Sequence, residues 1–128
     1  MTDSHTHFNL FVYGTLRRGG SAVDLLKQCT PIGMGTVGGV LYNIDNLHPA
    51  LVLYGASPVE GDVWKCPVGL LSTLDQYEGV SDGLFRRVGV TVMMELNEVP
   101  AWTYTAGPAL SRKLVPSQRI SSWPIKSL

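Results

Sequence analysis

A glycine-bounded segment, residues 13–20, is one of two features whose residue types suggest chemistry. It follows a short apolar run, residues 8–13, that predicts a buried strand. A strand that ends in Tyr13, Gly14, Thr15 and Leu16 exposes backbone N–H groups, and such groups can form an anion-binding concavity suited to a carboxylate or an amide oxygen. Taken alone, the segment is better explained as an ordinary strand-to-helix turn.

Glu78 is the second feature. The spacing of Leu70, Leu71, Leu74 and Tyr77 predicts a helix over residues 67–77, and Glu78 stands at its end. A carboxylate there meets the negative end of the helix dipole, at a cost of a few tenths to about 1 kcal/mol. This field and any burial raise the carboxyl pKa, which suits a general base that later returns its proton. The alternative, favoured by the residue alone, is a solvated surface glutamate.

Other polar residues are weaker candidates. Tyr104 belongs to a sheet face by default, although its hydroxyl can turn into a pocket. Arg86 can anchor Glu78 or a substrate carboxylate, or lie on the surface. Asp75 either couples with Glu78 as a like charge or pairs with Arg86 or its neighbour in sequence. A cysteine nucleophile is disfavoured, because no histidine partner is evident for Cys29.

The rest of the pattern predicts an α+β domain, a small mixed-sheet β-barrel with two or so flanking helices. Repeated glycines in residues 31–43 indicate bulges and sharp bending. Ser21 and Asp24 resemble a capping box that opens a short helix over residues 21–28. Turns are expected at His48-Pro49 and Ser57-Pro58, and a hairpin near Asn97, while Glu60 and Asp62 are expected in solvent or in a turn. Further strands are predicted at residues 51–54, 61–66, 85–95 and 101–105.

Composition points to one domain over residues 1–128, with a disordered lead at residues 1–7 and a strap from about residue 107, anchored by Trp123. Ten basic and ten acidic residues leave no net charge to attract nucleic acid or an anionic membrane. No apolar run approaches the roughly 20 residues of a membrane helix. With a polar N-terminus, Cys29 and Cys66 are expected as free thiols in a cytoplasmic protein. His5 and His7 are interpreted as a solvated tail, and no metal site is expected.

Several ordered segments resemble the γ-glutamylcyclotransferase-like superfamily. Residues 11–19, Phe-Val-Tyr-Gly-Thr-Leu-Arg-Arg-Gly, are similar to its opening motif, and residues 74–79, Leu-Asp-Gln-Tyr-Glu-Gly, to the motif that holds its catalytic glutamate. Residues 48–52, 61–64 and 85–88 resemble three further segments in the same order. Two departures stand out, because Phe85 and His48 occupy positions where the family pattern has tyrosine.

The resemblance implies a γ-glutamyl amine or peptide as substrate, cyclised to 5-oxoproline with release of the amine and without a cofactor. It implies that Glu78 is the acid/base residue and that the backbone of residues 13–16 holds the α-amino-acid end of the substrate. Substrate contacts are expected at Tyr13, Gly14, Thr15, Leu16, Phe85, Arg86 and Tyr104. The alternatives are a non-catalytic small-molecule binding module on the same fold and a protein whose C-terminal tail docks a partner. The leaving amine and the oligomeric state stay open.

Overall fold

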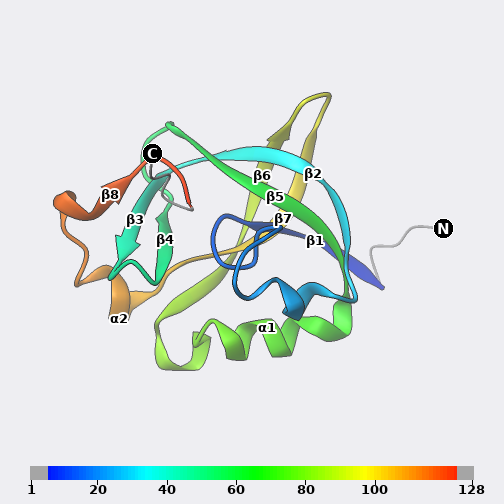
Figure 1. Ribbon diagram of the computed structural model, residues 1–128, viewed down its shortest axis with the longest axis horizontal. Coiled ribbons are helices and arrows are strands. Elements are labelled where there is room, and N and C mark those ends of the chain that lie inside the picture. The colour runs from blue at the N-terminus through cyan, green and yellow to red at the C-terminus, as the bar shows by residue number, and fades with distance from the viewer. Residues whose placement is uncertain (1–5, 124–128) are drawn as a thin grey trace.

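Five strands close into a barrel in the computed structural model, which describes residues 6–123 (Figure 1). Around the barrel the strands run β1 (His7–Val12), β5 (Pro58–Pro67), β2 (Thr30–Gly38), β6 (Phe85–Met94) and β7 (Glu98–Ala106). The pairing of β1 with β7 closes the circle, and it is parallel, with Leu10 opposite Trp102. The other four pairings are antiparallel. The predicted mixed-sheet barrel is therefore present.

Three strands extend the sheet beyond β7. Strand β4 (His48–Val52) pairs in parallel with β7, β3 (Val40–Ile44) pairs with β4, and β8 (Arg119–Ile120) pairs with β3. The turn expected at His48-Pro49 is wrong, because both residues pair within β4. The hairpin instead turns at Asp45 and Asn46, which both have positive φ. Aspartate and asparagine tolerate this left-handed backbone, so the turn is tight and β4 begins early.

The predicted helix at residues 67–77 is confirmed. A 3₁₀ turn, η3 (Val68–Leu70), leads into α1 (Leu71–Tyr77), which lies below the strands in Figure 1. Gly79 ends it with a φ of 66°, a conformation that glycine adopts without strain. The other helical pieces are η4 (Val80–Asp82), α2 (Pro108–Ser111) and η5 (Pro116–Gln118). The helix expected over residues 21–28 is only η2 (Val23–Leu26), and no side chain caps its start.

Two apolar clusters lie on opposite sides of β1, since successive side chains of a strand point to opposite faces. Leu10 and Val12 belong to the first cluster, which also takes in Leu74 of α1 and Leu26 of η2. Phe11 belongs to the second cluster. The first cluster packs α1 against β1. This packing positions Glu78, the residue that follows α1.

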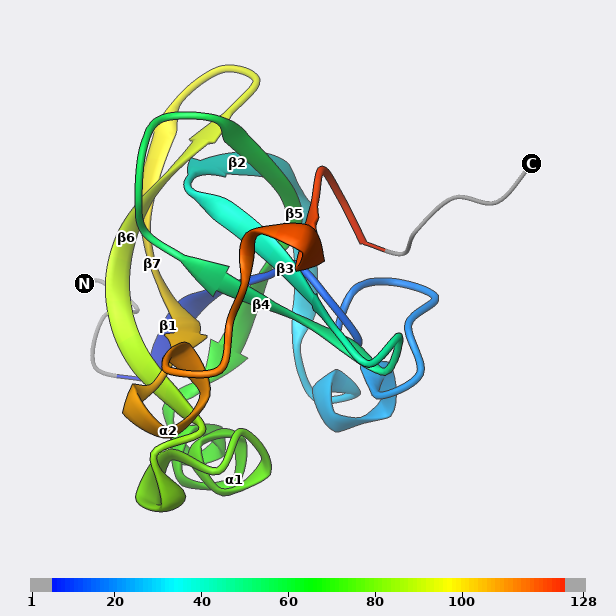
Figure 2. The same ribbon diagram turned by 90° about the vertical axis from the view of Figure 1, so that its left-hand side faces the viewer.

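The C-terminal segment returns across the sheet extension. In Figure 2 it runs from α2 along β4 and β3 to β8. Trp123 is half-buried against the second cluster. At the other end, the disordered lead expected at residues 1–7 is wrong for His7, which belongs to β1, and residues 1–5, His5 among them, lie outside the described residues. None of the helices within residues 6–123 is long and apolar enough to cross a membrane.

Candidate active site

A pocket of about 340 Å³ opens where strands β1, β4, β6 and β7 meet the end of α1. The end of β1 and the loop of residues 13–20 form one wall, and the first residues of β4 form another. The end of α1 and the start of β6 complete it. Seven of the expected site residues line this pocket: Tyr13, Gly14, Thr15, Leu16, Glu78, Phe85 and Tyr104. Residues as far apart in the chain as Tyr13 and Tyr104, which are separated by 91 positions, therefore meet at one place.

Glu78 is the sole carboxylate among the described residues that line the pocket. It follows α1 as the C-cap residue, and its backbone N–H donates a 2.9 Å hydrogen bond to Leu74. Burial raises the pKa of its carboxyl from 4.5 to about 7, because the protein withholds the water that would solvate the charge. The carboxyl can therefore accept and return a proton near neutral pH.

The 13–20 loop is fixed by its own turns and by β4. Within it, Arg17 N–H donates to Gly14 at 2.9 Å and Ala22 N–H to Thr15 at 2.9 Å. A Cβ atom on Gly14 would lie 2.6 Å from Cγ of Pro49, so glycine is required here by close approach and not by an unusual φ. Within residues 6–123, the N–H groups of Thr15 and Leu16 donate to no protein acceptor, which leaves them available to a ligand.

Tyr13 lines the pocket with its ring, but its hydroxyl is occupied elsewhere. The hydroxyl donates to the carbonyl of Tyr104 and accepts a 3.2 Å hydrogen bond from the N–H of Leu51. It thus joins β7 to β4 beside their single pairing. Burial, and then the charge of Glu78, raise the pKa of Tyr13, so the phenol remains protonated. Its contribution to the site is the position of the loop.

Tyr104 ends a chain of polar contacts that passes behind the pocket. Its hydroxyl donates a 2.6 Å hydrogen bond to Asp75. Arg87 donates two further hydrogen bonds to the same carboxylate, of 2.9 and 3.2 Å. The guanidinium also lies 4.6 Å from the ring centre of Trp102. Burial opposes the charge of Asp75, but these hydrogen bonds and the charge of Arg87 outweigh it and lower its pKa. Asp75 therefore pairs with Arg87 and does not act as a like-charge partner of Glu78.

Arg86 is the one expected site residue outside the pocket. It is exposed on β6, whereas the pocket wall is made by its neighbour Phe85, which is 8% exposed. Side chains alternate along a strand, so these two residues cannot face the same side. The alternation of side chains along residues 85–88 could have predicted that Arg86 points away from the side that Phe85 faces.

Several pocket residues were not expected from the sequence. Leu47, Tyr77 and Leu84 surround the opening although each is a large, exposed side chain. Pro49 forms the wall against Gly14. Tyr77 also approaches Thr15, with their hydroxyl oxygens 3.1 Å apart. Tyr77 could have been predicted as a site residue, because it directly precedes Glu78 in the motif of residues 74–79.

The structure also corrects the predicted environment of Asp62. It was expected in solvent or in a turn, but it is 5% exposed in the middle of β5. Its carboxylate accepts a 2.8 Å hydrogen bond from the N–H of Arg18 and lies 3.4 Å from the guanidinium of Arg17. A buried carboxylate needs such partners to offset lost hydration. Asp62 therefore belongs to the support of the 13–20 loop.

Known proteins share both this fold and the sequence pattern. A mouse AIG2-like protein superposes with a TM-score of 0.76 at 22% identity, covering 93% of this chain and 89% of its own. An Arabidopsis thaliana protein gives 0.70 at 25% identity, with 95% and 80% covered. A structure named gamma-glutamyl cyclotransferase gives 0.65 at 19% identity, with 78% and 66% covered. No curated protein shows a significant sequence match. The family model for gamma-glutamyl cyclotransferase, AIG2-like, matches residues 10–124, and the chain belongs to that family.

Proposed function

We propose that this protein is an enzyme that cyclises a γ-glutamyl amine or peptide to 5-oxoproline and releases the amine, with Glu78 as the acid/base residue. One observation carries the proposal. A carboxyl with a pKa of about 7 lines the same pocket as Thr15 and Leu16, whose N–H groups donate to no acceptor within residues 6–123. Membership of the gamma-glutamyl cyclotransferase family supports the same reaction.

The substrate supplies its own nucleophile, the α-amino group, which enters as an ammonium. Glu78 in its ionised form accepts one proton and frees the nitrogen lone pair. The nitrogen then attacks the γ-carbonyl carbon, so a C–N bond forms and closes a five-membered ring. The protonated Glu78 donates its proton to the leaving nitrogen as the original amide bond breaks, and the carboxylate then accepts a second proton from the attacking nitrogen. The released amine finally takes up the proton held by Glu78, which restores the carboxylate.

The loop would hold the half that every γ-glutamyl substrate shares. The N–H groups of Thr15 and Leu16 suit the α-carboxylate, or the oxygen that gains charge as the carbonyl is attacked. Both reacting groups belong to one molecule, so holding its two ends favours the near-attack geometry. Well-oriented attack of this kind contributes roughly 7–11 kcal/mol toward lowering a barrier.

The test compares Glu78→Gln with the wild type on a panel of γ-glutamyl amines and peptides, with 5-oxoproline as the measured product. Glutamine keeps the shape of the side chain and cannot accept the proton, so turnover is expected to fall below detection while the fold is retained. Glu95→Gln is the matched control, because Glu95 is exposed at the β6–β7 hairpin. Full activity in Glu78→Gln would show that the mechanism is wrong. Binding of a panel member without turnover by the wild type would identify a binding module instead.

A further inference from the structure

The 13–20 loop stands between two hollows. On one side is the candidate active site, and on the other a second cavity of about 670 Å³. Gly14, Thr15 and Ser21 line both of them. Tyr13 and Leu16 are buried in the two apolar clusters. Residues 17–20 carry no apolar side chain, so polar contacts must determine the position of this part of the loop.

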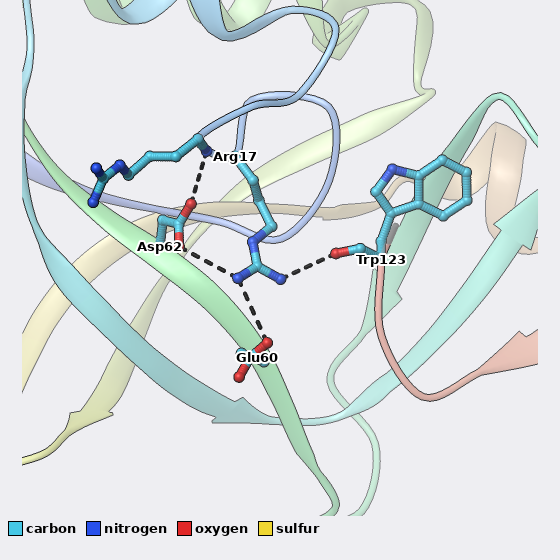
Figure 3. A network of polar contacts seen from close by, with 5 residues as sticks. Arg17, Glu60, Asp62 and Trp123 are labelled. Atoms are coloured by element: carbon cyan, nitrogen blue, oxygen red, sulfur yellow. Dashed lines mark hydrogen bonds and ion pairs between the residues drawn. The ribbon is translucent and has the colours of Figure 1, made fainter. Parts of the chain in front are cut away.

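The side chain of Arg17 makes three such contacts. Figure 3 shows its guanidinium between Asp62, Glu60 and the main-chain carbonyl of Trp123. The distances are 3.4 Å to Asp62, 3.6 Å to Glu60 and 3.0 Å to the Trp123 oxygen. The next residue, Arg18, donates its N–H to the other oxygen of Asp62 at 2.8 Å. The loop is thus tied to β5 and to the C-terminal segment.

The burial of each side chain indicates which contacts of Arg17 contribute most to holding the loop. The side chains of Arg17 and Asp62 are 12% and 7% exposed, whereas that of Glu60 is 52% exposed. Solvent screens the contact with Glu60, so it contributes little. The Arg17–Asp62 contact is shielded, and losing one partner leaves the other charge buried without compensation.

We propose that Arg17 is a positioning residue of the active site. Through its contacts with Asp62 and the Trp123 carbonyl, it holds the 13–20 loop in place. It thereby fixes the position of the N–H groups of Thr15 and Leu16 relative to Glu78. The relevance to catalysis rests on the proposed function. The C-terminal segment becomes part of the site, because its carbonyl is one of the three acceptors for the Arg17 side chain. Arg17 touches no reacting group and acts through the loop alone.

The first test is amide hydrogen exchange in the full-length protein, which does not depend on turnover. In Arg17→Met the hydrogen-bonded amides of Gly20 and Ala22 are expected to exchange about 10-fold faster or more, while the amides of β6 and β7, which lie away from Asp62, keep wild-type rates. Arg119→Met is the matched control, because Arg119 lies on the same C-terminal segment and its side chain contacts the hydroxyl and ring of Tyr42, away from the 13–20 loop. Unchanged loop exchange in Arg17→Met, or acceleration spread evenly over the barrel, overturns the proposal.

Two further variants guard against simple misfolding. Arg17→Lys keeps a positive charge beside Asp62 but lacks the fork that also reaches the Trp123 carbonyl, so an exchange rate between those of the wild type and Arg17→Met is expected. Asp62→Asn removes the charge and keeps an acceptor for Arg18. Because both residues act in one network, the double variant Arg17→Met/Asp62→Asn is expected to be no faster than the faster single variant. Additive effects would contradict a shared network.

Kinetics then connect the loop to the reaction. On a substrate that the wild type turns over, Arg17→Met is expected to lower kcat/KM by about 10- to 100-fold, since small displacements of positioning groups are costly. The pH midpoint set by Glu78 is expected to stay unchanged. Faster loop exchange with unaltered kcat/KM would reject the positioning role and leave the proposed function intact. If the wild type turns over nothing, the proposed function fails, and the exchange measurements still decide whether Arg17 holds the loop.

Discussion

The ring of His48 lies against the ring of Phe85, with the centroids 5.9 Å apart and the planes inclined by 59°. Both residues line the candidate active site, and both were singled out in the sequence as departures from the pattern that the family resemblance implies. The two departures therefore form one contact, between the start of β4 and the start of β6. An apolar ring and an imidazole therefore meet in the lining of the pocket.

Phe85→Tyr is expected to change substrate preference more than stability. The new hydroxyl adds a hydrogen-bonding group beside His48, where it favours substrates that can hydrogen-bond to it and disfavours those that cannot. The ratio of kcat/KM between an apolar and a polar γ-glutamyl amine is expected to change by about 10-fold. Phe8→Tyr is the matched control, because Phe8 packs against the same apolar cluster but lies outside the pocket. An equal effect of both variants would remove Phe85 from specificity.

Glu78 makes the protein less stable at alkaline pH. Its carboxyl has a folded-state pKa of about 7 against 4.5 unfolded, so the folded state binds the proton more tightly. The corresponding stability is present below pH 4.5 and is lost as the pH rises through 7. Glutamine carries no charge, so Glu78→Gln is expected to be more stable than the wild type by about 3 kcal/mol at pH 8.5 and nearly equal to it at pH 4.5.

Urea denaturation at several pH values measures this difference. The kinetic counterpart is a wild-type kcat/KM that rises with pH through a midpoint near 7, since the ionised carboxyl is the base. Glu95→Gln should show neither effect, because Glu95 is exposed. A Glu78→Gln stability difference that does not vary with pH would mean that burial does not perturb this carboxyl.

The sequence predicted the strands with apolar or alternating patterns well. Residues 85–95 and 101–105 correspond to β6 and β7, and the helix over residues 67–77 is present because its apolar face repeats at helical spacing. The start of β4 was missed. Pro49 suggested a turn, but its ring packs on Gly14, and this contact is made only after residues far apart in the chain have met.

The site was only partly predictable for the same reason. The 13–16 segment and Glu78 were identified as separate features, and the barrel brings them to one pocket. Asp62 was misplaced because a carboxylate between Gly61 and Val63 resembles a strand-end turn. Its burial depends on Arg17 and Arg18, 44 residues or more away. Local pattern cannot signal a charge that is buried only because a distant partner neutralises it.

Arg87→Met is expected to destabilise the protein by about 1–2 kcal/mol at pH 7, because it removes two charge-assisted hydrogen bonds to Asp75. The pKa of Asp75 is lowered in the folded state, so the stability that its ionised form contributes is present above its unfolded pKa and is lost as the pH falls through the folded value. The cost of the substitution should therefore shrink in acid.

Unfolding curves at neutral and acidic pH measure this cost. Arg86→Met is the matched control, since its exposed neighbouring position predicts a change within about 0.5 kcal/mol. Equal costs for the two arginines, or a cost for Arg87→Met that is the same at both pH values, would count against an ion pair with Asp75.

Gly14→Ala is expected to displace the 13–20 loop. The added Cβ would lie 2.6 Å from Cγ and 2.7 Å from Cδ of Pro49, and Pro49 is buried, so either the loop or β4 must shift. Overpacking of this kind costs about 1–3 kcal/mol, and the displaced N–H groups of Thr15 and Leu16 are expected to weaken substrate binding. Gly89→Ala is the matched control, because a Cβ on Gly89 meets nothing within 4 Å.

A second substitution tests whether the clash itself is the cause. Pro49→Ala removes both ring atoms that the new methyl would meet, so Gly14→Ala/Pro49→Ala is expected to cost less than the sum of the single variants, with a coupling of roughly 1 kcal/mol in unfolding free energy. Additivity within about 0.3 kcal/mol would mean that Gly14 is required for another reason. A coupled result would establish that the contact between β4 and the loop, and not an intrinsic need for glycine in a turn, fixes the wall opposite Glu78.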